Sequence, residues 1–388
     1  MFSYSVFLVS FSVWDAARRH PQFPMAGAGA QAVSELNPKV SNAFPGYQTN
    51  VAEVDLSVLW NLDFWGKYRR QTEAARATLL ASEWGRRAVL TSVVSSVATA
   101  YFQLRELDLA LDVSNSTLAS RRDSLRLTNV LAKNGSASML DVRQSEQLVY
   151  TAAETIPDLE RQIAQQENSL SILLGENPRA IPRGRQLTEQ PNLPTVPAGL
   201  PSELLERRPD IREAEENLIA ANAQIGVAKA AYFPSISLTG TAGLESYALS
   251  RLFTGSAGLW NVAGSLTQPV FEAGGLRSGM RLAEAQEQQM LLTYKQTIVD
   301  AFQQVSYALI AHQKDREFRE QQELLTSAAQ DTDRLSRMLY KNGSASYLQV
   351  LTSETNYFSA QLNLAQAELN ERLTLVQLYN ALGGGWQH

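Results

Sequence analysis

The sequence predicts a mainly α-helical chain with a small β part, and three recurring features carry that prediction. The hexapeptide KNGSAS occurs at 133–138 and again at 341–346. Apolar residues repeat every seven positions on either side of it, which is typical of coiled-coil helices. Segments that alternate between apolar and polar side chains precede each helical stretch, which is typical of β-strands. The chain is therefore expected to be two copies of one unit, each with two strands and two long helices.

The clearest strand pattern runs from Val51 to Asp63, where the even positions are apolar and most odd positions are polar. The other three candidate strands are Met25 to Val33, Ser235 to Glu245 and Trp260 to Pro269. Each has about the length that a tilted strand needs to cross a bilayer. A soluble β-sandwich with one solvated face would show the same alternation. Four strands beside very long helices leave no second sheet to cover them, so we favour the membrane interpretation.

The helical stripes are long and regular. A helix from about Trp65 to Leu131 would extend on the order of 100 Å, which suits a bridge or a wall better than a compact domain. Its apolar positions at intervals of seven are Leu90, Val97, Leu104, Leu111, Leu118 and Leu125, and those of the following helix are Val142, Val149, Ile156, Ile163 and Leu170. The two stripes predict an antiparallel coiled-coil hairpin.

The turns between the helices carry helix-capping residues. Asn-Gly in each hexapeptide can supply the left-handed residue that ends a helix. Ser138 with Asp141, and Ser346 with Gln349, are expected to form capping boxes that start the next helix. A simple hairpin turn would explain the Asn-Gly and the Ser. Because the flanking residues also coincide in both copies, we expect the two tips to form a docking surface.

Composition excludes several function classes. The chain has no Cys and only three His, far apart in sequence, so thiolate and histidine-rich metal sites are not expected. Asp and Glu outnumber Lys and Arg by 39 to 34, which argues against a nucleic-acid partner. No phosphate loop or nucleophile elbow is present in the sequence. We expect a protein that is not an enzyme and needs no cofactor.

Four strands cannot close a membrane barrel, and an open edge facing lipid is not tolerated. Several copies of the chain are therefore expected to pool their strands, and the same pooling would let the long helices enclose a wet cylinder. The polar strand face carries the candidate pore-lining acids Glu53, Asp55, Asp63 and Glu245. These acids predict a cation-preferring pore.

Three segments resemble a known family. LERRPDI at 205–211, AANAQIGVAKAAYFPSISL at 220–238 and LGGGW at 382–386 are similar to segments of the outer membrane factors, the TolC-like exit ducts. More narrowly, they resemble the lipoprotein outer-membrane subunits of resistance-nodulation-division (NodT-type) efflux systems. The resemblance implies a homotrimer in the outer membrane of a Gram-negative bacterium. A 12-stranded β-barrel among outer-membrane lipids would continue into a trimeric α-barrel in the periplasm, docked through a periplasmic adaptor to an inner-membrane efflux transporter.

The resemblance also implies roles for residues near the hexapeptides. The adaptor-binding tips would be Asn134, Gly135, Ser136 and Ala137 in the first copy and Asn342, Gly343, Ser344 and Ala345 in the second. The periplasmic gate would involve Asp141, Tyr340 and Gln349. The family often has acids at the positions of Gln349 and Thr352, so a ring of several carboxylates is not expected here. Type I protein secretion and a structural coiled-coil or periplasmic adaptor remain alternatives, and the adaptor would not need the four alternating segments.

The expected domain boundaries follow the two copies. An irregular N-terminus (1–21) precedes the first strand pair (22–63), the first hairpin (64–174) and an equatorial linker (175–201). A helical segment (202–232), the second strand pair (233–270), the second hairpin (271–382) and a short tail (383–388) follow. Compared with the second copy, the first is shortened by its leading helices. Residues 1–14 are apolar but lack both a preceding basic residue and a clear cleavage site, and no lipid-acceptor Cys is present, so an altered start is favoured over a working signal peptide.

Overall fold

A computed structural model of the chain describes residues 12, 15–16, 23–37, 47–187 and 201–384. The N-terminal segment 1–21 lies almost wholly outside these described residues, as do most of the linker and the last four residues. The described chain forms two compact units, one from residues 1–86 and 209–298 and the other from residues 87–208 and 299–388. Each unit is described separately below.

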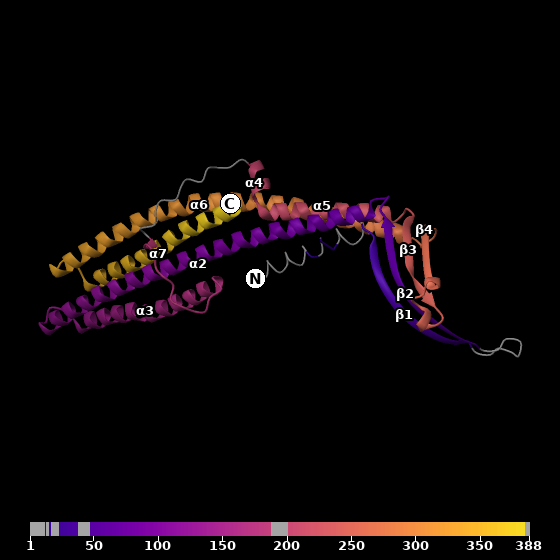
Figure 1. Cartoon of the computed structure of the whole chain (residues 1–388). Coiled ribbons are helices and arrows are strands. Elements are labelled where there is room, and N and C mark those ends of the chain that lie inside the picture. The colour runs from indigo at the N-terminus through magenta and orange to yellow at the C-terminus, as the bar shows by residue number, and fades with distance from the viewer. Residues whose placement is uncertain (1–11, 13–14, 17–22, 38–46, 188–200, 385–388) are drawn as a thin grey trace. The chain divides into compact units, whose positions relative to one another are not determined.

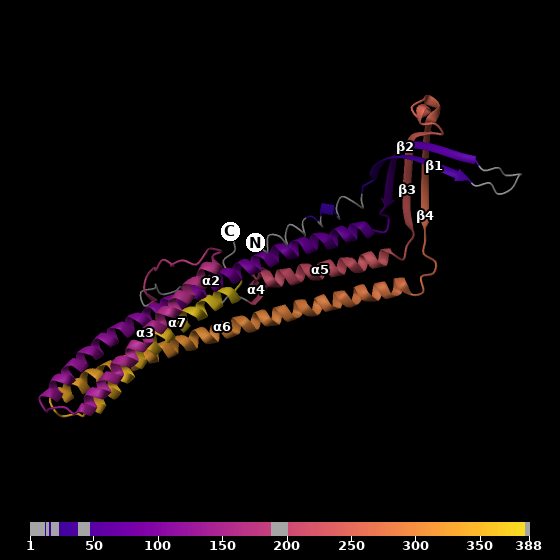
Figure 2. The same ribbon diagram turned by 90° about the horizontal axis from the view of Figure 1, so that it is seen from below.

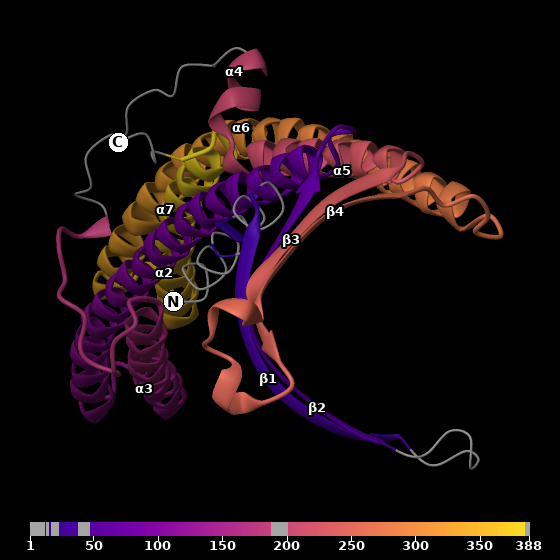
Figure 3. The same cartoon turned by 45° about the vertical axis from the view of Figure 1, so that its right-hand side comes forward.

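The first unit contains one antiparallel sheet of four strands. These are β1 (Met25–Asn37), β2 (Tyr47–Leu62), β3 (Ser235–Ser246) and β4 (Gly258–Thr267), paired in the order β1-β2-β3-β4. Figure 3 shows them as a single curved sheet. The short 3₁₀ turns η2 (Leu249–Arg251) and η3 (Gly255–Ala257) lie between β3 and β4. Helix α5 (Pro209–Ala230) and the first turns of helices α2 and α6 complete this unit.

The strand register gathers the apolar side chains on one face. Leu56 lies opposite Ala28 of β1 and Ala242 of β3, and Trp260 of β4 lies opposite Ala242 on its other side. Directly opposed residues in an antiparallel pair point to the same face. This face is open in the single chain, since Leu56 is 54% and Trp260 79% exposed. An apolar face therefore runs without interruption across all four strands.

Two expected strand ends are wrong by one and two residues, and each has a physical reason. The second strand ends at Leu62 because the carboxylate of Asp63 turns to the first amides of α2. The last strand spans Gly258–Thr267 and stops before Pro269, which has no amide hydrogen for a ladder bond. The small-residue segment at 25–33 is confirmed as a strand that continues to Asn37.

The second unit is built from two helical hairpins (Figures 1 and 2). The first joins α2 (Lys67–Lys133) to α3 (Met139–Leu173), and the second joins α6 (Gly275–Lys341) to α7 (Tyr347–Ala381). Helices α2 and α6 begin in the first unit and end in the second, and α4 (Pro201–Arg207) precedes α5. Both long helices have 67 residues and both partners have 35. The internal repeat is thereby confirmed at the level of helix length.

The heptad stripes meet as expected where α2 packs against α3, whereas Leu90, the first position of the expected stripe, is 51% exposed. Leu104 of α2 is fully buried against Leu170 of α3. Further along, Leu118 of α2 packs with Val149 and Ala152 of α3. The pairs run in opposite directions along the two helices, so the hairpin is the predicted antiparallel coiled coil.

Candidate functional site

The two tip turns have the same backbone. Gly135 and Gly343 adopt the left-handed conformation, with φ of 75° and 72°. The amide of Ser136 donates to the carbonyl of Leu131 at 2.8 Å, and the amide of Ser344 donates to that of Leu339 at 2.9 Å. The amides of Gly135 and Gly343 donate to the carbonyls of Ala132 and Tyr340, both at 3.0 Å, and the two bonds together make a Schellman motif at each helix end. The predicted left-handed glycines are confirmed.

Only one of the two predicted capping boxes forms. The hydroxyl of Ser138 accepts from the amide of Asp141 at 3.1 Å, and the Asp141 carboxylate accepts from the amide of Ser138 at 3.0 Å. The prediction for Ser346 with Gln349 is wrong, because the Ser346 side chain makes no cap bond. There the amide of Gln349 donates instead to the backbone carbonyl of Ser346 at 3.2 Å, so the first turn tightens.

The predicted gate residues fall into two groups. Tyr340 lies near Asp141, and its ring contacts that of Tyr347 with centroids 5.2 Å apart. Burial raises the pKa of Tyr340, and the Asp141 carboxylate and Tyr347 raise it further. Gln349 is exposed and lies outside this contact. The structure thus brings Asp141 and Tyr340 together within one chain and leaves Gln349 apart.

A buried charged cluster above the tips was not predicted from the sequence. The Arg337 guanidinium of α6 binds the carboxylate of Asp333 at 2.9 Å and that of Glu354 on α7 at 2.9 Å. The Ser124 hydroxyl of α2 lies 3.1 Å from Arg337 and 3.3 Å from the Glu354 carboxylate. Arg121 of α2, which is 2% exposed, donates to the Leu148 carbonyl of α3. The cluster therefore joins the first hairpin to the second through charge-assisted hydrogen bonds.

The surroundings of Glu354 make its ionised form less favourable than that of a free carboxyl. Burial raises the pKa of Glu354, and Asp333 raises it further, whereas Arg337, Arg121 and the Ser124 hydroxyl act in the other direction. One oxygen of the carboxylate has no hydrogen-bond partner among the described residues. The sequence showed these residues only as scattered charges on helices, because contacts such as that between Ser124 and Glu354, 230 residues apart, depend on how the two hairpins are packed.

The polar face of the sheet holds three of the four predicted pore acids. Glu53 lies opposite Gln31 on one side and Glu245 on the other, and the Gln31 amide donates to Glu53 at 2.7 Å. Asp55 lies between Gly29 and Gly243. A Cβ on Gly243 would clash with the backbone of β2, so glycine there lets the strand pass beside Asp55.

Asp63 has a different position from the other three acids. It follows β2, and its two carboxylate oxygens accept from the amides of Tyr68 and Arg69 at 3.1 and 2.9 Å. It also pairs with the Arg69 side chain at 3.5 Å. Asp63 therefore starts helix α2, a role that the alternation of strand residues did not indicate.

Comparisons with known proteins agree with this geometry. The sequence profile described as "Outer membrane efflux protein" matches residues 16–176 and 200–384. The chain is 35% identical over 373 residues to the cation efflux system protein CusC of Escherichia coli, covering 96% of this chain and 79% of that protein. It is 40% identical over 328 residues to the probable efflux pump outer membrane protein TtgC of Pseudomonas putida, covering 84% and 68%. A crystal structure of CusC, solved to follow folding and transmembrane channel formation, superposes with a TM-score of 0.93 at 31% identity, covering 99% and 88% of the two chains.

The chain belongs to the outer membrane efflux protein family. The resemblance to outer membrane factors is thereby confirmed, and the outer membrane is the location of the family.

Two of the motifs that carried the resemblance meet in the second unit of this efflux protein. The Arg208 guanidinium, from LERRPDI, donates to the Ala381 carbonyl at 2.9 Å and to the Gln304 side chain at 2.8 Å. Gly383, from LGGGW, has a φ of 96° and lies so close to the Arg207 carbonyl that a Cβ would be 2.9 Å from its oxygen. The motifs thus tie α4 to the ends of the second hairpin, which is a structural role.

No group of three or more His, Asp or Glu among the described residues of the efflux protein is placed to hold a metal ion. No helix within the described ranges combines the length and the apolar character needed to cross a membrane.

Proposed function

We propose that three copies of this chain form an outer-membrane exit duct that passively conducts small molecules, as the last part of a tripartite efflux pump. The observation that carries the proposal is the apolar face that crosses all four strands. Val262 and Leu266 on that face are 74% and 68% exposed, so the single chain leaves it uncovered. Lipid would cover such a face at no cost in buried polar groups.

The open edges of the sheet support a trimer. Strands β1 and β4 are the two ends of the strand order, and no further described strand pairs with either. Unpaired edge strands in lipid leave backbone hydrogen-bonding groups unsatisfied. Pairing β1 of one copy with β4 of the next would satisfy both edges, and three copies would give the expected twelve strands. The two hairpins of each copy would then supply the wall of the periplasmic helical barrel.

The relatives support small-molecule efflux over protein secretion. The two compared above are named as a cation efflux protein and an efflux pump outer membrane protein. A conduit needs no catalytic group, so we propose that the chain is not an enzyme. Glu53, Asp55 and Glu245 on the polar sheet face, with Asp63 at its end, would line the pore and favour cations.

A direct test is to purify the protein from outer-membrane fractions and measure its mass and conductance. We expect a trimer by native mass spectrometry and stepwise channels in planar bilayers. A monomer that inserts nowhere and conducts nothing would contradict the proposal.

We further propose that the tip turns dock the periplasmic adaptor. The matching Schellman turns present residues 134–137 and 342–345 as two similar loops, exposed except for the half-buried Ala137 and Ala345. Replacing Gly135 and Gly343 together by Trp is expected to abolish export while the trimer still assembles, since nothing lies within 4 Å of either glycine in the single chain. The double Ala variant is the matched control, because it has the same backbone strain without the bulk. Equal export by the two variants would contradict docking at the tips.

We also propose that Asp141, Tyr340 and Gln349 belong to the periplasmic gate. Asp141 lies beside the first tip turn, and Tyr340 and Gln349 lie beside the second. The proximity of Asp141 and Tyr340 supports this role, because a carboxylate and a phenol can exchange partners between neighbouring copies. Tyr340→Phe is expected to raise the open fraction of single channels relative to the wild type. An unchanged open fraction would contradict the gating role of Tyr340 and would leave it only a role in packing.

A further inference from the structure

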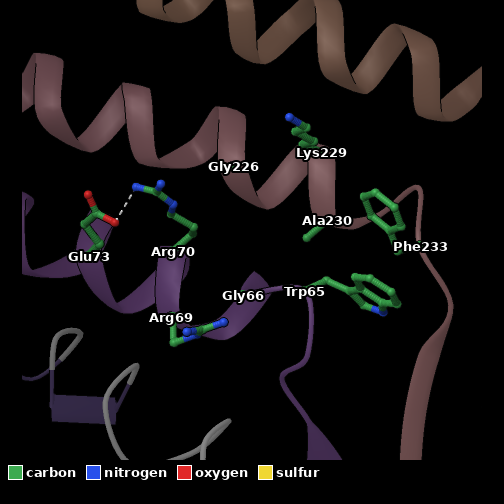
Figure 4. Close-up of a pocket in the computed structure, with 9 residues that line it drawn as sticks. All are labelled: Trp65, Gly66, Arg69, Arg70, Glu73, Gly226, Lys229, Ala230 and Phe233. Carbon is green, nitrogen blue, oxygen red and sulfur yellow. Dashed lines mark hydrogen bonds and ion pairs between the residues drawn. The ribbon is translucent and has the colours of Figure 1, made fainter.

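A cavity of about 620 Å³ lies in the first unit, where β2 leads into α2 and α5 leads into β3. Its lining includes three cations, Arg69, Arg70 and Lys229, and two aromatic rings, Trp65 and Phe233 (Figure 4). None of the proposed tip, gate or pore residues lines it.

More cationic than acidic side chains line this cavity. Arg70 pairs with Glu73 at 2.7 Å, and Arg69 pairs with Asp63 at 3.5 Å. No carboxylate in the described part of the chain lies within ion-pair distance of the Lys229 ammonium. The site therefore has a net positive charge and one ammonium free to bind an anion.

Close packing holds Arg70 in place. A Cβ on Gly226 of α5 would lie 2.8 Å from the Arg70 Cγ, so the stem of Arg70 lies directly on the α5 backbone. Figure 4 shows this side chain rising from α2 beside Gly226, with Lys229 one turn further along α5. The two cations thus come from adjacent helices and flank one opening.

The aromatic pair marks the boundary between the sheet and the helices. The rings of Trp65 and Phe233 stack with centroids 4.6 Å apart, and the indole Nε1 donates to the Pro234 carbonyl at 2.7 Å. A second cavity touches the same two rings and is also lined by Leu62 and Ile236. Those two residues are opposite one another in the β2–β3 ladder and belong to the apolar face. Trp is enriched where a membrane meets water, because its ring is apolar and its N–H is polar.

We propose that the cavity binds the phosphate headgroup of an anionic phospholipid. Lys229 and Arg70 hold the phosphate, the Trp65–Phe233 pair lies at the headgroup level, and the acyl chains follow the apolar face from Leu62 and Ile236. This assignment rests on the proposed function, since it requires the apolar face to lie in a membrane. Each cation near an anionic headgroup contributes about fivefold in affinity, which corresponds to about 1 kcal/mol.

The test is native mass spectrometry of the delipidated protein titrated with phosphatidylglycerol, with phosphatidylcholine as the zwitterionic reference. The variant Arg70→Gln with Lys229→Gln is expected to bind phosphatidylglycerol about thirtyfold more weakly. The matched control is Arg281→Gln with Lys295→Gln, which removes the same charge from exposed positions of α6 in the same unit. It is expected to bind like the wild type. Lys229→Gln alone is expected to weaken binding severalfold, and it keeps the packing of Arg70 on Gly226.

Three results would overturn the assignment. The first is equal phosphatidylglycerol binding by the double variant and its control. The second is equal affinity of the wild type for both lipids. The third is displacement of phosphatidylglycerol by excess inorganic phosphate, which would show a site for the free anion. Channel conductance of the same preparations separates this inference from the proposed function, because a conducting protein without lipid preference contradicts only the inference.

Discussion

The buried cluster between the hairpins leads to an asymmetric prediction for its two charged partners. Arg337→Gln removes the cation that pairs with both Asp333 and Glu354, whose side chain is 3% exposed. Removing one partner of a buried ion pair typically costs about 3–5 kcal/mol, because the remaining charge is left uncompensated. The Arg337 side chain is 30% exposed, so we take the lower end, about 3 kcal/mol. For a unit of about 200 residues this corresponds to a fall of roughly 6–12 °C in melting temperature.

Glu354→Gln is expected to behave differently. The pKa of Glu354 is raised in the folded chain, chiefly by burial. A carboxyl with a raised folded pKa stabilises the fold below its unfolded pKa, and that contribution is lost as the pH rises through the folded pKa. At pH 8 the ionised Glu354 therefore opposes folding, and the neutral Gln removes that opposition. We expect Glu354→Gln to melt at or above the wild-type temperature at pH 8.

The assay is thermal unfolding of the purified protein in one detergent, followed by circular dichroism at pH 8 and pH 5. The control is Arg334→Gln, which removes an exposed Arg paired with Asp331 on the same helix and should shift melting by about 1 °C or less. The loss in Arg337→Gln should shrink at pH 5, since the unpaired Glu354 carboxylate, whose pKa is raised, takes up a proton more readily there. The reasoning would be refuted if Arg337→Gln melted like Arg334→Gln, or if Glu354→Gln lost as much as Arg337→Gln.

Three further predictions follow from the helix starts, the core and the polar sheet face. Ser138→Ala should destabilise the first hairpin by about 1 kcal/mol in chemical unfolding, whereas Ser346→Ala should have almost no effect because its side chain makes no cap bond; equal losses would contradict the difference between the tips. Leu104→Ala should cost about 2–5 kcal/mol in the same measurement, since the side chain is fully buried, and a loss below 1 kcal/mol would show that the coiled-coil seam is not a stabilising core. Glu53→Gln with Glu245→Gln should reduce the cation preference measured from reversal potentials in a salt gradient, and anion preference of the wild-type channel would contradict the role of these acids.

The elements of this protein were largely readable from local patterns. The heptad positions from Leu104 to Leu118 predicted which face of α2 is buried, since helical periodicity depends only on neighbours along the chain. The Asn-Gly turns were readable for the same reason, because a left-handed residue is a local requirement that glycine meets. The alternation around Leu56 predicted an apolar sheet face before any pairing was known.

Polar side chains with more than one possible partner nearby in the chain could not be assigned in this way. Asp63 belonged to the strand pattern, yet its carboxylate caps a helix. Ser346 matched the capping pattern of Ser138, yet its neighbour Gln349 bonds to backbone instead. In both places the sequence allowed two partners for one polar group, and the local backbone selected one of them.

The sequence by itself determined the repeat, the helix lengths, the strand faces and the family, because each depends on the order and spacing of residues. Only the tertiary structure decided that Arg337 and Glu354 meet Ser124 of the other hairpin, and that Arg70 and Lys229 flank one cavity. Contacts between helices that are far apart in the chain depend on the rotation of each helix about its axis. That rotation is set by packing of the whole unit, which no short stretch of sequence contains.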